Sequence, residues 1–176
     1  YDNNNENNNN DDDDDDMDIG EKELESLEGI IEHLLACLKD KDTVVRWSAA
    51  KGIGRITGRL PMEMANEIVS SVLLLFGPNE GEFSWHGGCL TIAELSRRGL
   101  LLPKRLGEIM PVINKALIYD QNQGNYSIGG NVRDAACYVA WAFARAYDPE
   151  ILAPYVLDLA QSLLLTCLYD REVNCR

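Results

Sequence analysis

The sequence predicts an all-α solenoid of the HEAT or armadillo type, with about three and a half antiparallel helix pairs behind a disordered acidic tail. Similar strings open the second helix of each pair at Val45, Trp85, Val132 and Val173, at intervals of 40, 47 and 41 residues. No stretch has the alternating pattern of a strand. Periods of this length with two helices per unit are typical of these arrays, because one helix pair cannot bury its apolar face without neighbours.

The acidic tail carries most of the charge. The 176 residues have a formal net charge of −13, yet residues 1–28 contain 13 of the 29 acids and only one of the 16 bases. Residues 1–19 are rich in Asn and Asp and include the unbroken run Asp11–Asp16. This composition buries too little apolar surface to offset chain entropy, so we predict disorder there. The nearly neutral remainder shows no basic stripe, which argues against a nucleic acid partner.

The helices of the body follow from apolar residues spaced three and four apart. The first helix is expected from near Gly20 to Leu38, and the second from Val44 to about Leu60. Pro61, Pro103 and Pro149 begin the first helices of later pairs, where the missing amide is harmless, and Pro111 is expected to kink the third. The pairs are therefore expected at residues 20–60, 61–99, 103–147 and 149–176, the last one truncated.

The cysteines and the C-terminal apolar stretch indicate a protein of the cytosol. Five cysteines in helical, apolar surroundings fit free thiols better than a disulfide framework. Residues 151–169 are apolar, but Pro154, Asp158 and Gln161 interrupt them, so we predict a packed helix without membrane insertion. We interpret the chain as a fragment, and its fourth pair is expected to expose an apolar face that self-associates.

Two insertions point to a binding surface. The turns over 77–84 and 120–131 are longer than their counterparts over 39–43 and 170–172, and all four lie where a first helix turns into a second. Insertions confined to one edge of a solenoid often form its binding surface, although they are also tolerated as plain surface loops. The residues predicted to contact a partner are Trp47, Trp85, His86, Arg97, Arg98 and Tyr126. Trp141 lies in an apolar helix and is predicted to be core.

Other residue patterns favour architecture over chemistry. Arg46 and Arg133, with Asp134, are predicted to be repeat-architecture residues in which each arginine pairs with acids near the preceding turn. His33 with Cys37 and His86 with Cys89 have helical spacing, but they lie on different units and predict neither a zinc site nor a cysteine nucleophile. Gly124, Gly129 and Gly130 lack the lysine and Ser/Thr of a phosphate loop. We therefore expect no catalytic residue, metal or cofactor, and a noncatalytic protein-binding solenoid.

Several strings resemble the tubulin-folding cofactor D, or tubulin-specific chaperone D, family from about residue 27 to the end. They are residues 40–55 (DKDTVVRWSAAKGIGR), 85–90 (WHGGCL), 97–103 (RRGLLLP), 131–139 (NVRDAACYV) and 141–147 (WAFARAY). The resemblance does not include the acidic tail. A generic helix-pair repeat does not require strings such as Trp85–Leu90, so the resemblance is specific.

The resemblance implies a segment of a large cytoplasmic chaperone associated with the microtubule cytoskeleton. It implies that β-tubulin is bound, that the α/β-tubulin heterodimer is assembled and disassembled together with cofactors C and E, and that GTP hydrolysis by tubulin is stimulated. An Arf-like small GTPase is a further implied partner. The alternative that the residues alone leave open is a generic HEAT-repeat scaffold, of the transport or phosphatase adaptor type.

Overall fold

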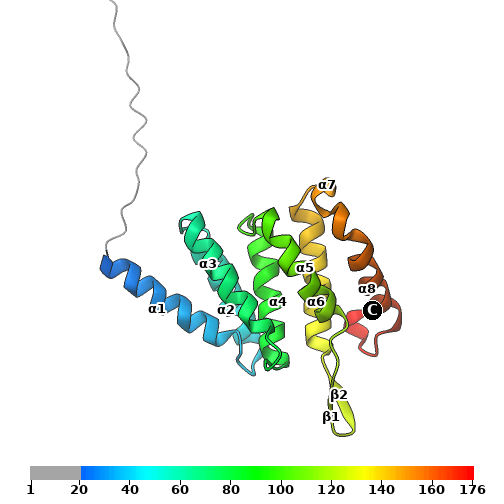
Figure 1. Ribbon diagram of the computed structural model, residues 1–176. Coiled ribbons are helices and arrows are strands. Elements are labelled where there is room, and N and C mark those ends of the chain that lie inside the picture. Colours follow the sequence, from blue (N-terminus) through cyan, green and yellow to red (C-terminus); the bar gives the residue numbers. More distant parts are fainter. Residues whose placement is uncertain (1–20) are drawn as a thin grey trace, which may run out of the picture.

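The computed structural model describes residues 21–176, with side chains from Ser26 onward (Figure 1). The predictions for residues 1–19 lie outside these described residues. The described part is an α-solenoid of antiparallel helix pairs, as predicted. Its elements are α1 (Glu21–Cys37), α2 (Thr43–Thr57), α3 (Met62–Leu73), α4 (Glu82–Arg97), α5 (Leu106–Leu117), α6 (Gly130–Ala146), α7 (Pro149–Leu152) and α8 (Val156–Tyr169).

Local signals mark the starts of several helices. Asp42 caps α2, because its Oδ1 accepts a 2.8 Å hydrogen bond from the backbone N–H of Val44. Pro61 stands immediately before α3, and Pro149 is the first residue of α7. Pro103 opens a short 3₁₀ turn that leads into α5, and α5 runs without interruption through Pro111. The chain thus contains the consecutive helices α1 and α2, α3 and α4, and α5 and α6, followed by α7, α8 and a 3₁₀ turn over Val173–Cys175.

The second helices α2, α4 and α6 form one layer, and α4 is its centre. Every residue of α4 from His86 to Ser96 is buried, because α2 and α6 flank it and the second-pair helix α3 and its following turn pack against it. Two glycines permit this approach. A Cβ on Gly87 would overlap the carbonyl oxygen of Leu38, and a Cβ on Gly88 would lie 2.6 Å from the Phe76 ring. The core of the array therefore runs through the Trp85–Gly88 string.

One strand pair interrupts the helical pattern, so the expectation of no strand is wrong. β1 (Gln121–Gln123) and β2 (Tyr126–Ile128) pair antiparallel, with Gln123 opposite Tyr126. Gly124 and Asn125 form the two-residue turn, and Gly124 has φ +62°, a conformation that favours glycine. The hairpin projects from the array at the edge where first helices turn into second helices (Figure 1).

The C-terminal apolar stretch packs on one side only. Pro149–Tyr169 is long and apolar enough, by length and composition, to cross a membrane, and it is 11% buried over its apolar window. It is not one straight helix, since a 3₁₀ turn over Ala153–Tyr155 separates α7 from α8. Leu159 and Leu163 pack toward the core, whereas Leu157 and Leu168 are exposed. The predicted packed helix is therefore correct for one face, and the absence of membrane insertion stays a prediction.

Candidate functional site

The turns between first and second helices form a continuous edge, which we call the turn edge (residues 39–43, 77–84, 120–131 and 170–172). Side chains of each turn bond to the next turn along the array. The bonds are Lys39 Nζ to Glu80 Oε1 at 2.6 Å, Asn131 Nδ2 to Glu82 Oε1 at 3.3 Å, and Arg171 Nη2 to Asp120 Oδ1 at 2.9 Å. The turn edge is thus one connected surface rather than four separate loops.

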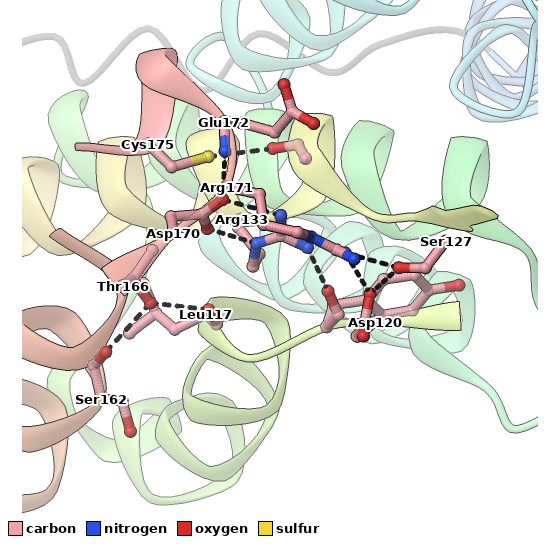
Figure 2. A network of polar contacts seen from close by, with 12 residues as sticks. Leu117, Asp120, Ser127, Arg133, Ser162, Thr166, Asp170, Arg171, Glu172 and Cys175 are labelled. Carbon is pink, nitrogen blue, oxygen red and sulfur yellow. Dashed lines mark hydrogen bonds and ion pairs between the residues drawn. The ribbon is translucent and has the colours of Figure 1, made fainter. Parts of the chain in front are cut away.

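The hairpin is fixed to this edge at its base. Ser127 on β2 donates a hydrogen bond to Asp120, and Arg171 of the fourth pair bonds to both residues (Figure 2). The hydrogen bonds to Ser127 and Arg171 hold the pKa of Asp120 below its usual value. Tyr126, next to Ser127, keeps 67% of its surface exposed. The hairpin therefore presents an aromatic side chain from an anchored base.

A groove of about 650 Å³ lies between the hairpin and the turn before α4; we call it the turn-edge groove. Tyr126 lines it from the hairpin and Phe83, 42% exposed, lines it from the start of α4. Its remaining lining includes the polar side chains of Lys39, Glu80, Gln121 and Gln123. Exposed aromatic side chains within a polar rim are the composition of protein-binding surfaces.

Arg46 lies directly beneath this groove and supports it. Its guanidinium carbon is 5.0 Å from the centre of the Phe83 ring. Its Nη1 donates to the carbonyl oxygen of Asp40 at 2.6 Å, and its Nη2 to Oγ1 of Thr43 at 2.9 Å. Burial lowers the pKa of Arg46, against the nearby carboxylates that raise it. The predicted pairing of Arg46 with an acid of its own turn is wrong, since a backbone carbonyl and a hydroxyl take that place.

His86 is the fourth partner of Arg46, not a contact for another protein. The Nε of Arg46 donates to Nδ1 of His86 at 2.9 Å, and only 4% of His86 is exposed. Burial, followed by the charge of Arg46, lowers the pKa of His86 to about 4, so this side chain is neutral at neutral pH. The prediction that His86 binds a partner is therefore wrong, because the neighbouring pair covers it.

Arg133 repeats the arrangement one pair from the C-terminal end (Figure 2). Its Nη1 donates to the carbonyl oxygen of Tyr119 at 2.8 Å, as Arg46 does to Asp40. Its Nε and Nη2 bond to the two carboxylate oxygens of Asp170 at 2.5 and 2.9 Å. The acid thus belongs to the following turn, not to the preceding one as predicted. Asp134 is exposed and makes no hydrogen bond within the described residues, so it does not share this architectural role.

Trp85 is part of an internal aromatic cluster. Its ring lies 5.3 Å from the Phe76 ring in a T-shaped contact and 5.1 Å from the Tyr119 ring. These neighbours come from its own pair and from the next pair, so Trp85 fastens the two together. Trp85 is half-buried in this cluster, and its predicted role as an anchor for another protein stays a prediction.

Trp47, Arg97 and Arg98 lie on a different surface, the exposed side of the α2–α4–α6 layer. Trp47 is half-buried against Tyr138, with ring centres 5.6 Å apart, and Arg97 donates a 2.8 Å hydrogen bond to the Tyr138 hydroxyl. Trp141 stacks on Tyr138 and is 47% exposed, so its predicted place in the core is wrong. No further element covers this side of α6 within the described residues. The structure thus separates the six predicted contact residues, and only Tyr126 lies on the turn-edge groove.

The structure gives no support to chemistry at the cysteines or the glycine loop. Cys89 is fully buried and burial raises the pKa of its thiol, the opposite of what a nucleophile requires. Residues 21–176 contain no group of three or more His, Cys, Asp or Glu arranged to hold a metal ion. Gly124 lies in the hairpin turn with φ +62°, and Gly129 precedes α6 with φ +139°. Cys89 is therefore not an activated thiol, and the glycines of the long turn have a structural role.

Phe83 and Glu80 are the groove residues that sequence reasoning missed. Both lie in the 77–84 insertion, so the length of that turn was the available signal. On the other surface Tyr138 and Arg145 were missed, because each lies within a helix that reads as core. Their exposure depends on which neighbours cover the helix, and no local pattern reports it.

Comparison with known proteins finds one family model over the whole chain and relatives over most of it. The family model described as "Tubulin-specific chaperone D-like, ARM repeats" matches residues 1–176. The chain is 51% identical over 144 residues to "Tubulin-specific chaperone D" of Dictyostelium discoideum, covering 79% of this chain and 10% of that protein. It is 33% identical over 164 residues to "Tubulin-folding cofactor D" of Schizosaccharomyces pombe, covering 85% of this chain and 15% of that protein. No solved structure matches.

Proposed function

Because the chain belongs to the tubulin-specific chaperone D family, we propose that it is a helical-repeat part of a tubulin-folding chaperone and that it binds β-tubulin through the turn-edge groove. The chain spans only 10% and 15% of the two relatives, so it is one portion of the surface that such a protein offers. In this proposal it acts as a noncatalytic scaffold in the assembly and disassembly of the α/β-tubulin heterodimer.

The observation that supports the groove is an exposed aromatic pair on a rigid edge. Phe83 rests on Arg46, and Arg46 is held by four partners from two helix pairs. Tyr126 projects from a hairpin that Arg171 fixes at its base. Side chains that are already ordered lose little entropy on binding, so they suit a contact with a folded partner.

The remaining partners of the proposal follow from the family. Cofactors C and E and an Arf-like small GTPase would bind the longer chaperone, in the cytoplasm and at the microtubule cytoskeleton. Any GTP hydrolysis in these complexes takes place on tubulin or on the small GTPase. This chain would contribute to that activation only by holding tubulin in place.

The proposal is tested by capture of purified tubulin on the immobilised chain, followed by crosslinking and peptide mapping. The test variant combines Phe83→Ser and Tyr126→Ser, which removes two exposed rings. Because Phe83 also contacts the buried Arg46, circular dichroism checks that the variant is folded. The control combines Met62→Ser and Leu157→Ser, which removes two exposed apolar side chains, 47% and 79% exposed, away from the turn edge. We expect the test variant to lose about tenfold in affinity, as for two interface anchors, and the control to bind as the unmodified chain does.

Crosslinks from the turn edge to β-tubulin support the proposal further. Equal affinity of the unmodified chain and the Phe83/Tyr126 variant contradicts the groove as the contact. If no variant binds tubulin, the generic HEAT-repeat scaffold of the transport or phosphatase adaptor type is favoured instead.

A further inference from the structure

The second helices concentrate the positive charge of the nearly neutral body. Residues 43–60, 82–99 and 130–147 contain eight bases and three acids. One of these acids, Glu94, is 3% exposed and already pairs with Arg97 at 3.3 Å and Arg98 at 3.5 Å. Arg46 and Arg133 are buried, so the exposed bases of these helices are Lys51, Arg55, Arg59, Arg97, Arg98 and Arg145, which no single segment contains.

These side chains form one surface on the exposed side of the α2–α4–α6 layer. We call it the basic face and define it by Lys51, Arg55, Arg59, Arg97, Arg98, Trp141 and Arg145. A cavity of about 510 Å³ is lined by Arg55, Arg59 and Arg98. The side chain of Arg98 passes over Gly54 there. At the other end, the guanidinium carbons of Arg97 and Arg145 lie 5.6 and 5.5 Å from the Trp141 ring centre, and the three residues line a cavity of about 340 Å³.

Aromatic rings connect the two ends. The Lys51 ammonium is 5.6 Å from the Trp47 ring centre, Trp47 contacts Tyr138, and Tyr138 stacks on Trp141 with an interplanar angle of 16°. Lys51, Arg55, Arg59 and Arg145 form no ion pair with any side chain from Ser26 onward. The face thus offers unpaired cations along a continuous strip.

We propose that the basic face binds the acidic run Asp11–Asp16 of the same chain. The run contains six consecutive carboxylates, and Asp18 follows close behind. Extended chain spans about 3.3 Å per residue, so six residues reach across roughly 20 Å, the scale of a strip over three packed helices. The inference is independent of tubulin binding, since it concerns a different surface.

The connection between the two parts is short enough for binding within one chain. Four residues separate Asp16 from Glu21, the first residue of α1, and the five residue steps between them extend over roughly 17 Å. α1 and α2 are consecutive antiparallel helices that contact each other, so the run is connected directly to the layer that carries the basic face (Figure 1). A short tether gives an effective concentration of about a millimolar, which compensates for modest electrostatic affinity.

A single-stranded nucleic acid is the competing occupant, because basic and aromatic side chains together also bind bases and phosphates. The net charge of −13 argues against it, since the tethered carboxylates repel a polyanion from the face that they themselves fit. Each molecule of the chain carries its own acidic run, so a nucleic acid would have to displace that run from the basic face.

The test measures the anisotropy of a labelled peptide with the sequence of residues 1–18, titrated with the 176-residue chain. In one variant Asp11–Asp16 are all replaced by Asn, which frees the face and keeps the tail length. We expect this variant to bind the peptide about tenfold more tightly than the unmodified chain, whose own run competes. Adding Lys51→Glu, Arg55→Glu and Arg59→Glu to the Asn-substituted chain should weaken peptide binding at least about tenfold. A salt concentration of about 1 M should weaken it similarly, because it screens charges beyond about 3 Å.

The control for the charge reversals is Lys104→Glu with Lys115→Glu, in the same Asn-substituted chain. Both lysines are exposed and lie outside the second helices, so affinity should remain within about twofold. Circular dichroism confirms that each variant is folded before titration. Equal binding by the unmodified and Asn-substituted chains overturns the proposal, as does absence of binding by both. Tighter binding of a labelled oligonucleotide than of the peptide also overturns it.

Discussion

Arg46 donates its Nε–H to Nδ1 of His86 across 2.9 Å, and this bond joins the second helices of consecutive pairs. The two residues are 40 apart and hold equivalent places near the starts of α2 and α4. Because Nδ1 accepts a hydrogen bond, His86 must be neutral, with its proton on Nε2. The contact between the first two pairs therefore depends on the protonation state of one buried histidine.

We expect stability to fall as the pH is lowered from about 6.5 to 4. The pKa of His86 is about 4 in the folded chain and 6.5 when unperturbed, so the unfolded chain binds more protons within this window. The contribution of neutral His86 to the free energy of unfolding is complete above this window and is lost below it. The loss is about 3 kcal/mol at most. Urea unfolding at pH values above, within and below the window measures this loss.

His86→Asn is the matched control for the pH experiment. The asparagine Oδ1 occupies the place of Nδ1 and accepts from Arg46, yet it does not titrate in this range. The carboxylates titrate equally in both proteins, so the difference between the two pH profiles reports the titration of His86 alone. Identical profiles would show that the Arg46–His86 bond is not coupled to stability.

Two Arg–Asp pairs of the turn edge are expected to differ sharply in importance. The side chains of Arg133 and Asp170 are 9% and 2% exposed, whereas those of Arg171 and Asp120 are 61% and 52% exposed. Asp170→Ala leaves a buried guanidinium without its partner and should cost about 3 to 5 kcal/mol of unfolding free energy. Asp120→Ala should cost less than about 1 kcal/mol. Denaturant titration of both variants measures this difference.

Low pH should destabilise the chain in the same way as Asp170→Ala. The hydrogen bond from Arg133 holds the pKa of Asp170 at about 2, below its ordinary 3.8. Its contribution is therefore present above pH 3.8 and is lost as the pH falls through 2. An Asp170→Ala variant that unfolds with the same acid profile as the unmodified chain would contradict this assignment.

The helix pairs could be predicted from the sequence because they depend on local spacing. Apolar residues at three- and four-residue steps report a helix directly, and the recurrence of Val45 and Val132 reports the period. The partners of the repeated arginines could not be predicted, since Arg46 and Arg133 bond forward to His86 and Asp170, 40 and 37 residues away. Contacts between units leave no pattern within one unit.

The same limit applies to the tryptophans. Trp85 stands next to a long turn and reads as exposed, but it packs against Phe76 and Tyr119 and is half-buried. Trp141 lies in an apolar helix and reads as core, but the packing direction of α6 leaves it 47% exposed. The hairpin was missed although Gly124–Asn125 is a turn signal, because the flanking glutamines and asparagine have low strand propensity.

Gly87→Ala should destabilise the chain by separating α4 from the first pair. The added Cβ would overlap the carbonyl oxygen of Leu38, a backbone atom that cannot rotate away. Overpacking of this kind typically costs about 1 to 3 kcal/mol. Gly29→Ala is the control, since nothing lies within 4 Å of its Cβ, and alanine in the middle of α1 should stabilise by up to about 1 kcal/mol. An unchanged midpoint of thermal unfolding for Gly87→Ala would show that α4 can accommodate the added methyl group.

The outer face of α8 is expected to drive self-association of the 176-residue chain. Leu157, Leu164 and Leu168 are 79%, 59% and 64% exposed on a single helix, and exposed apolar patches of this kind associate in water. Leu164→Glu with Leu168→Lys should produce a monomer, because it removes the patch and adds a favourable pair four residues apart. Ile118→Glu with Leu74→Lys makes the same charge changes at two exposed residues outside α8 and should leave association unchanged. Sedimentation velocity over a range of concentrations distinguishes these states. A monomeric unmodified chain, or equal effects of both variants, would exclude α8 as the associating surface.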